Sequence, residues 1–249
     1  MKINQVHIEK LLSFLHDNKD SYFVIGGHAA AVHFENAGLE FRTTKDFDIV
    51  LVTKLDDSDF SKQVASFLIE GGYENRYRNE RKTAYRFENP KFADFPMIIE
   101  FFVEEGKFPE SLDKKLAKLD IKVNEEKISA IVLENDIYEF AKKHVVTQYD
   151  LPIVDVKGLI ALKTYAYFRN LELYELKLVK SDDYLKHKKD VFRLLTILDD
   201  TNPIENIPGV LKTAMSNFLP ILENADDLSR NYKIPLKTVV DAYKKIAGL

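Results

Sequence analysis

Apolar and polar positions follow two spacings that alternate along the first 150 residues of the chain. Helical spacing favours helices at 3–16, 28–35 and 57–70, and the last of these ends at Gly71-Gly72, as helices commonly do. Short apolar runs typical of strands lie at 22–25, 47–52, 83–88, 97–103 and 127–133. The first half of the chain is therefore predicted to be an α/β (α+β) domain.

The strand signals fade beyond Pro152, and helical spacing dominates the rest of the chain. Helices are predicted at 155–180, 182–199, 205–223 and 235–247, separated or interrupted at several prolines. The favoured junction is Asp150-Leu151-Pro152. We therefore predict two domains, an α/β domain over 1–150 and a helical domain over 151–249.

Composition narrows the class of protein. The 249 residues are 45% hydrophobic, which is ample for a core, and the lack of cysteine excludes disulfides and thiolate metal sites. The first helix is amphipathic and unlike a signal peptide, and no apolar run reaches membrane-span length, so a soluble cytoplasmic protein with no membrane partner is expected. A net charge of −4 argues against tight nucleic-acid binding through bulk charge, although basic patches at 76–86 and 177–193 keep RNA open as a partner.

Candidate chemistry is concentrated between Tyr22 and Val52. An apolar run ends at Gly26-Gly27, where the absence of side chains lets backbone N–H groups approach a phosphate at the start of the next helix. In the following apolar run, alternation places Asp46 and Asp48 on one face of a strand, where two carboxylates can share a divalent cation. One site would then hold a metal and a triphosphate.

A third carboxylate is expected, because two divalent ions carry more charge than two aspartates balance. Glu100 is the candidate, since it is the one acid inside the apolar run from Met97 to Val103. A carboxylate there is costly unless it binds metal or pairs with a cation such as Arg86. We favour the metal ligand over the ion pair or a strand-edge glutamate.

The order of these motifs resembles the nucleotidyltransferase superfamily of the DNA polymerase beta type, in which a glycine turn precedes Asp-x-Asp. The segment Arg42-x-Thr44-x-Asp46-x-Asp48 is most similar to the AbiEii/AbiGii toxin-like nucleotidyltransferases. The resemblance implies a nucleotidyltransferase-type mixed sheet with flanking helices, followed by a helical C-terminal lobe. It also implies transfer of a nucleoside monophosphate from an NTP to a hydroxyl acceptor, with Mg²⁺ or Mn²⁺ held by Asp46, Asp48 and Glu100.

The helical half carries a looser resemblance to the same family. Lys163 follows Ala-Leu as in the AbiEii-like segment, and Asp190 stands in a Lys-Asp pair. The resemblance implies that Lys163 contacts the triphosphate and that Asp190, or one of the other carboxylates, accepts a proton. A snorkelling lysine and a helix-surface aspartate are the alternatives. Two residues depart from the pattern: His28 replaces a phosphate-binding hydroxyl residue after the glycines, and Arg193 stands where a further acid is usual. An imidazole can still donate to phosphate, so His28 is expected to bind the nucleotide together with Gly26 and Gly27.

The resemblance further implies a toxin of a toxin–antitoxin pair, with tRNA or a protein as acceptor and a cognate antitoxin as partner. Two other classes compete with this hypothesis. A catalytically silent nucleotidyltransferase-fold protein would act by binding a partner, although three clustered carboxylates argue against it. A dinucleotide-binding domain is disfavoured, because Gly26-Gly27 lacks the G-x-G-x-x-G pattern.

Overall fold

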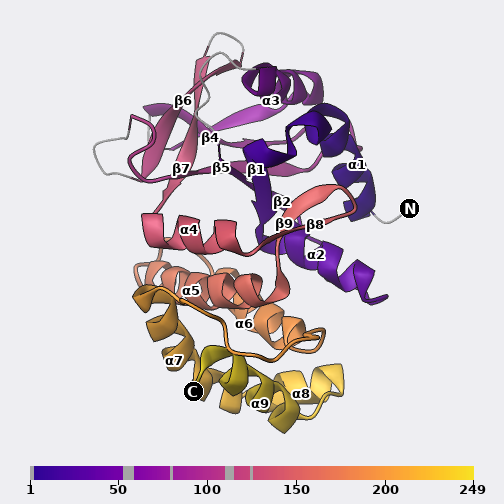
Figure 1. Ribbon diagram of the computed structural model, residues 1–249. Helices are drawn as coiled ribbons and strands as arrows, with labels where there is room; N and C mark the ends of the chain where they lie inside the picture. The colour runs from indigo at the N-terminus through magenta and orange to yellow at the C-terminus, as the bar shows by residue number, and fades with distance from the viewer. Residues whose placement is uncertain (1–2, 53–58, 79–80, 110–114, 124–125) are drawn as a thin grey trace. The chain divides into compact units, whose positions relative to one another are not determined.

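The computed structural model describes residues 3–52, 59–78, 81–109, 115–123 and 126–249 (Figure 1). The chain divides into two compact units, Met1–Val154 and Asp155–Leu249. The first unit is built on a mixed sheet with helices, and the second consists of helices in its described structure. The α/β class predicted from the hydrophobic pattern is confirmed.

Nine strands of the described residues form the sheet of the first unit, in the order β3-β4-β7-β5-β2-β1-β9-β8. Strand β6 lies off this path and pairs with β7, and β4 pairs with β5 as well. The strands are β1 (Tyr22–Ile25), β2 (Asp46–Leu51), β3 (Glu74–Arg78), β4 (Arg81–Glu88), β5 (Ile98–Glu104), β6 (Leu116–Val123), β7 (Glu126–Leu133), β8 (Val145–Gln148) and β9 (Leu151–Val154).

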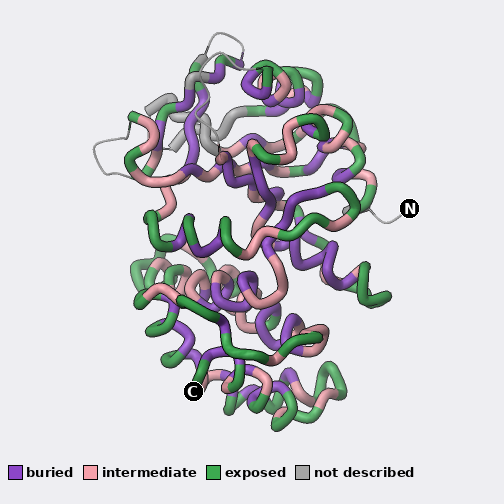
Figure 2. The backbone as a smooth tube through the Cα atoms, viewed as in Figure 1, coloured by how far each residue is buried: buried purple, intermediate pink, exposed green. Residues whose placement is uncertain are grey.

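The strands at the centre of this sheet carry many buried apolar residues, and Figure 2 shows buried segments in purple. Strand β1 runs antiparallel to β2, and β2 runs parallel to β5. Along β5, buried and half-buried residues alternate strictly, so one face packs into the core and the other stays accessible. The apolar runs that predicted strands at 47–52 and 97–103 therefore belong to a sheet that is buried on one face and partly open on the other.

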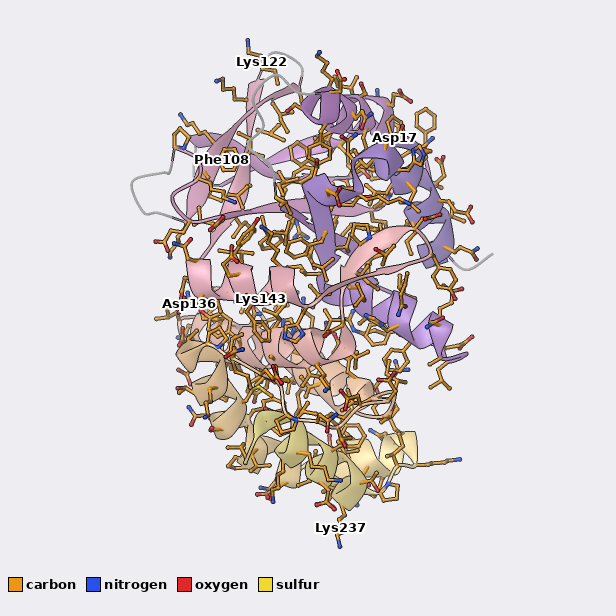
Figure 3. All side chains as sticks on the ribbon, in the orientation of Figure 1. Asp17, Phe108, Lys122, Asp136, Lys143 and Lys237 are labelled. Carbon is orange, nitrogen blue, oxygen red and sulfur yellow. The ribbon has the colours of Figure 1, made fainter. Side chains whose placement is uncertain are left out.

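Four α-helices and a short 3-10 helix accompany the described sheet: α1 (Ile3–Leu15), the 3-10 helix His16–Ser21, α2 (Gly26–Asn36), α3 (Asp59–Gly71) and α4 (Asn135–Lys143). Helix α2 packs against β1 and β2, and α3 packs against α1 and β6. In α4, Asp136 lies in the first turn and Lys143 in the last, where their charges complement the helix dipole (Figure 3).

The second unit contains α5 (Val156–Glu175), α6 (Ser181–Leu194), α7 (Gly209–Glu223), α8 (Asp226–Tyr232) and α9 (Leu236–Ala247). Asp155 caps α5 by accepting a hydrogen bond from the backbone N–H of Gly158 at 2.7 Å. Helix α5 packs against α6 and α7, and the rings of Tyr167 and Tyr243 pack around Phe218. Helix α5 ends five residues before the predicted position 180, and Lys177 beyond its end adopts a left-handed φ of 60°.

The elements that the pattern missed are mostly short. Strands β3, β6, β8 and β9 and helices α4 and α8 have no counterpart among the predicted elements. Strand β9 includes Pro152, so the residues expected to be the junction belong to the sheet, and the division between the units falls after Val154. None of the helices in the described part of the chain is long and apolar enough to cross a membrane.

Candidate active site

Three charged side chains lie in one row across neighbouring strands. Asp48 on β2 is the register partner of Glu100 on β5, and Glu100 is the register partner of Arg86 on β4. Residues paired in register point to the same face of a sheet. Asp48, Glu100 and Arg86 therefore share one face, although they are far apart in sequence.

Asp46 joins this row from two residues earlier on β2. Alternation places Asp46 and Asp48 on the half-buried face, while Phe47 and Ile49 between and after them are buried in the core. Asp46, Asp48 and Glu100, the carboxylates predicted from the sequence, are thus brought to the same face of adjacent strands.

Arg86 is the partner that two of these carboxylates have in the structure. Its guanidinium donates to Glu100 Oε1 at 2.6 Å and to Asp46 Oδ1 at 3.4 Å, and its Nε donates to Glu88 at 3.2 Å. Burial alone would lower the pKa of this guanidinium, but the three carboxylates raise that pKa above its ordinary range, with Glu100 contributing most. The ion pair that the sequence offered as an alternative for Glu100 is therefore present.

The N-terminus of α2 lies directly beside the carboxylate of Asp48. Helix α2 begins at Gly26, which has a left-handed φ of 72°, and a Cβ added there would lie 3.0 Å from Cγ of Asp48. A Cβ on Gly27 would lie 3.0 Å from Cβ of Thr44, which is buried. Both positions need glycine, and the first turn of a helix offers backbone N–H donors to an anion.

His28 occupies a different place from the one that the sequence suggested. Its side chain is fully buried, stacks on Phe47 with ring centroids 4.1 Å apart, and its Nδ1 is 2.8 Å from the backbone oxygen of Asp46. Burial, with smaller contributions from His7 and Arg42, lowers the pKa of His28 to about 3. The imidazole is neutral and enclosed, which leaves the backbone N–H of His28, in the first turn of α2, as the group available for the predicted contact with a phosphate.

The donor set suits a divalent cation in number and kind, because oxygen ligands from three carboxylates share one face. Their arrangement does not yet suit one: within the described ranges, no group of three or more His, Asp or Glu side chains is placed to hold a metal ion. Arg86 accounts for this, since it draws Asp46 and Glu100 toward its own guanidinium.

Lys163 and Asp190 are brought together in the second unit. Lys163 Nζ on α5 lies 2.7 Å from Asp190 Oδ2 on α6, and the two side chains are only 4% and 1% exposed. This buried ion pair differs from both alternatives considered for the sequence, a snorkelling lysine and a surface aspartate. In this arrangement Lys163 neutralises Asp190, so a contact with phosphate would require the pair to open.

The sequence offers Arg86 only as an alternative partner for Glu100 and does not indicate its contacts with Asp46 and Glu88. Arg86 belongs to the basic patch predicted at 76–86. The side chains at 76–78 and 81–85 lie outside the described residues. The sequence does show that Arg86 lies in an apolar run, two residues before Glu88. No local pattern shows that β4 pairs with β5, however.

His33 is a further buried histidine. Its Nε2 lies 2.8 Å from the backbone oxygen of Val154, and this hydrogen bond links α2 to β9.

Comparison with known proteins finds similar three-dimensional structures but no similar sequences. No protein-family profile matches the sequence, and no curated protein sequence matches it. The solution structure of the antibiotic-resistance factor ANT(2'')-Ia aligns over 91% of this chain and 99% of its own, with 13% identity and a TM-score of 0.42. The crystal structure of JHP933 from Helicobacter pylori covers 100% of this chain and 91% of its own (12% identity, TM-score 0.41).

A third structure, the Megavirus polyadenylate synthase, aligns over 90% of this chain but 38% of its own, with 10% identity and a TM-score of 0.39. At such identities and TM-scores the likeness assigns neither a family nor an activity to this chain. The argument for function therefore rests on the side chains described above.

The close approach of α2 to the loop before β2 predicts the effect of a single methyl group. Gly27→Ala should lower the free energy of unfolding by about 1–3 kcal/mol, because the new Cβ meets Thr44. The double variant Gly27→Ala/Thr44→Ala should recover part of this loss. Urea unfolding measures both, with Gly209→Ala as control, since a Cβ there meets nothing within 4 Å. Equal stability of Gly27→Ala and Gly209→Ala would contradict the packing.

Burial of neutral His28 predicts a loss of stability in acid. The unfolded chain takes up a proton near pH 6.5, whereas folded His28 does so only near pH 3, so stability is complete above pH 6.5 and falls as the pH drops toward 3. Between pH 6 and 4.5, His28→Gln should reduce the slope of unfolding free energy against pH by about 1.4 kcal/mol per unit. Exposed His16→Gln is the control, and an unchanged slope in His28→Gln would refute the assignment.

The buried pair between α5 and α6 predicts an asymmetry between single and double variants. Lys163→Met should destabilise the protein by about 3–5 kcal/mol, because it leaves Asp190 buried without its cation. Lys163→Met/Asp190→Leu should recover most of that stability. Lys186→Met on α6, whose pair with Asp183 is partly exposed, should cost about 0–1 kcal/mol. A mild effect of Lys163→Met in urea unfolding would argue against the ion pair.

Proposed function

We propose that this protein is a metal-dependent nucleotidyltransferase that moves a nucleoside monophosphate from an NTP to a hydroxyl acceptor and releases pyrophosphate. One observation carries the proposal: three carboxylates share one face of adjacent strands, and one of them, Asp48, lies against the side-chain-free start of a helix. Carboxylates suit a cation and the helix start suits phosphates, and a metal–NTP complex needs both at once.

Each side chain has a defined part in this proposal. Asp46, Asp48 and Glu100 would hold Mg²⁺ or Mn²⁺, which when bound supplies positive charge to the phosphates. The backbone N–H groups of Gly26, Gly27 and His28 would bind phosphate oxygens at the positive end of α2. No side chain at either glycine obstructs the approach of the anion.

The proposal extends to the second unit on one condition. Lys163 would contact the triphosphate, and Asp190 would accept a proton from the acceptor, only if their ion pair opens when nucleotide binds. An ammonium close to the departing pyrophosphate would stabilise the developing charge. Because the ion pair itself stabilises the fold, NTP binding by the double variant Lys163→Met/Asp190→Leu, which should recover most of the stability, separates this role from a purely structural one.

The acceptor class follows from the AbiEii-like resemblance and belongs to the proposal. We infer tRNA or a protein hydroxyl as acceptor, in a toxin whose activity a cognate antitoxin would restrain. The segment Arg42-x-Thr44-x-Asp46-x-Asp48 supports this closer assignment. A basic surface would assist an RNA acceptor, because Lys and Arg neutralise its phosphates.

One observation favours a second candidate, a catalytically silent protein of the same fold that binds a partner. Arg86 neutralises Glu100 and Asp46 in the structure, so these carboxylates have a structural partner without any metal. In a silent protein the carboxylates and Arg86 would serve only to stabilise the fold. It would bind no nucleotide in the presence of Mg²⁺.

A transfer assay distinguishes the two functions. Wild-type protein is incubated with each α-labelled NTP in turn, Mg²⁺, and either total RNA or whole-cell protein, and label in one fraction identifies the acceptor class. Asp48→Asn should reduce transfer by at least about a thousandfold, since it removes a charge that the proposed cation requires. Asp17→Asn, at an exposed aspartate, should leave transfer unchanged. Equal transfer by Asp48→Asn and wild type would refute the proposal.

A further inference from the structure

We propose that Arg86 is a built-in counter-cation that occupies the carboxylate site and must release Asp46 and Glu100 before a divalent cation can bind. This inference rests on the proposed function, because it concerns the same three carboxylates. It assigns to Arg86 the control of metal affinity, a role that neither the motifs nor the resemblance gives it.

The geometry of the guanidinium supports this role. Arg86 on β4 extends over Glu100 on β5 and reaches Asp46 on β2, so one side chain spans three strands. The two bonds use both terminal nitrogens, Nη1 and Nη2, and face the acids that a cation would need. The side chains involved are only 17–34% exposed, which limits the screening of these charges by solvent.

Repulsion explains why such a cation is needed. Three carboxylates close together on one face repel one another, and each also resists removal from water. A folded chain without metal therefore requires a positive charge at this position. Arg86 supplies it, and a divalent cation would supply the same charge more compactly. The two cations are alternatives for the same oxygen atoms.

Glu88 provides a second position for the guanidinium. It lies two residues from Arg86 on the same strand and therefore on the same face, and Arg86 Nε already donates to it at 3.2 Å. When Asp46 and Glu100 turn toward a cation, Arg86 can keep this bond and rotate toward Glu88. Glu88 thus lowers the cost of releasing the other two acids.

The test measures metal binding directly and needs no transfer activity. Binding of Mn²⁺ to wild type and variants is followed by electron paramagnetic resonance of the free ion. Arg86→Met should bind Mn²⁺ at least about tenfold more tightly than wild type, because no internal cation competes. Glu88→Gln should bind it more weakly, because Arg86 then loses its alternative partner. Arg169→Met, which removes an arginine paired with Glu172 on the surface of α5, is the control and should match wild type.

Thermal stability provides a second test of the competition between Arg86 and the metal ion. Without metal, Arg86→Met should melt at a lower temperature than wild type, and saturating Mn²⁺ should raise its melting temperature by more than it raises that of wild type. Should Arg86→Met fail to fold without metal, refolding in Mn²⁺ and the affinity of Glu88→Gln decide the question. Refolding only with Mn²⁺ would support the inference, and failure in both conditions together with wild-type affinity in Glu88→Gln would overturn it.

Failure of this inference is distinguishable from failure of the proposed function. Unchanged or weaker Mn²⁺ binding by Arg86→Met overturns the role of Arg86, even if wild type transfers label from an NTP. Tighter binding by Arg86→Met supports that role, even if no transfer is seen. Absence of Mn²⁺ binding in both proteins overturns the inference together with the metal requirement of the proposed function.

Discussion

The register of β2 between β1 and β5 is the constraint on which the site depends. Asp48 faces Ile25 at the end of β1 on one side and Glu100 on the other. A slip of one residue would turn both aspartates of β2 into the core and bring Phe47 to the accessible face. The burial of Phe47 and Ile49 opposes such a slip, so core packing and the placement of charge reinforce each other.

The same register determines what can follow β1. Because Ile25 lies opposite Asp48, the next residue begins α2 directly beside that carboxylate, and Gly26 can take this position with its positive φ. The helix thus starts against Asp48, which shares its face of the sheet with Asp46 and Glu100. Its positive end attracts these carboxylates as it would attract a phosphate, and this attraction partly offsets the repulsion among them.

Local patterns in the sequence were enough to predict some of these features. Alternation within β2 predicted the shared face of Asp46 and Asp48, and the apolar run from Met97 to Val103 marked Glu100 as an acid among apolar neighbours. The partnership of Arg86 depends on β4 pairing antiparallel with β5, which no local spacing specifies. His28 was assigned from its place after the glycines, whereas tertiary packing against Phe47 decides its environment. A motif in the sequence does not determine such contacts, because they join residues that lie far apart in the chain.

The row of charges also bears on how the protein reaches its folded state. Cation sites formed only by carboxylates gain their stability when metal arrives, and before that moment they oppose folding. An arginine on a neighbouring strand removes this dependence, because Arg86 on β4 contacts Glu100 on β5 and Asp46 on β2 without any metal. Under the proposed function the cost would fall on metal affinity, since an incoming cation would compete with a charge that the fold already holds in place. A site of this kind, stable when empty, would bind a metal more weakly than its three carboxylates alone would allow.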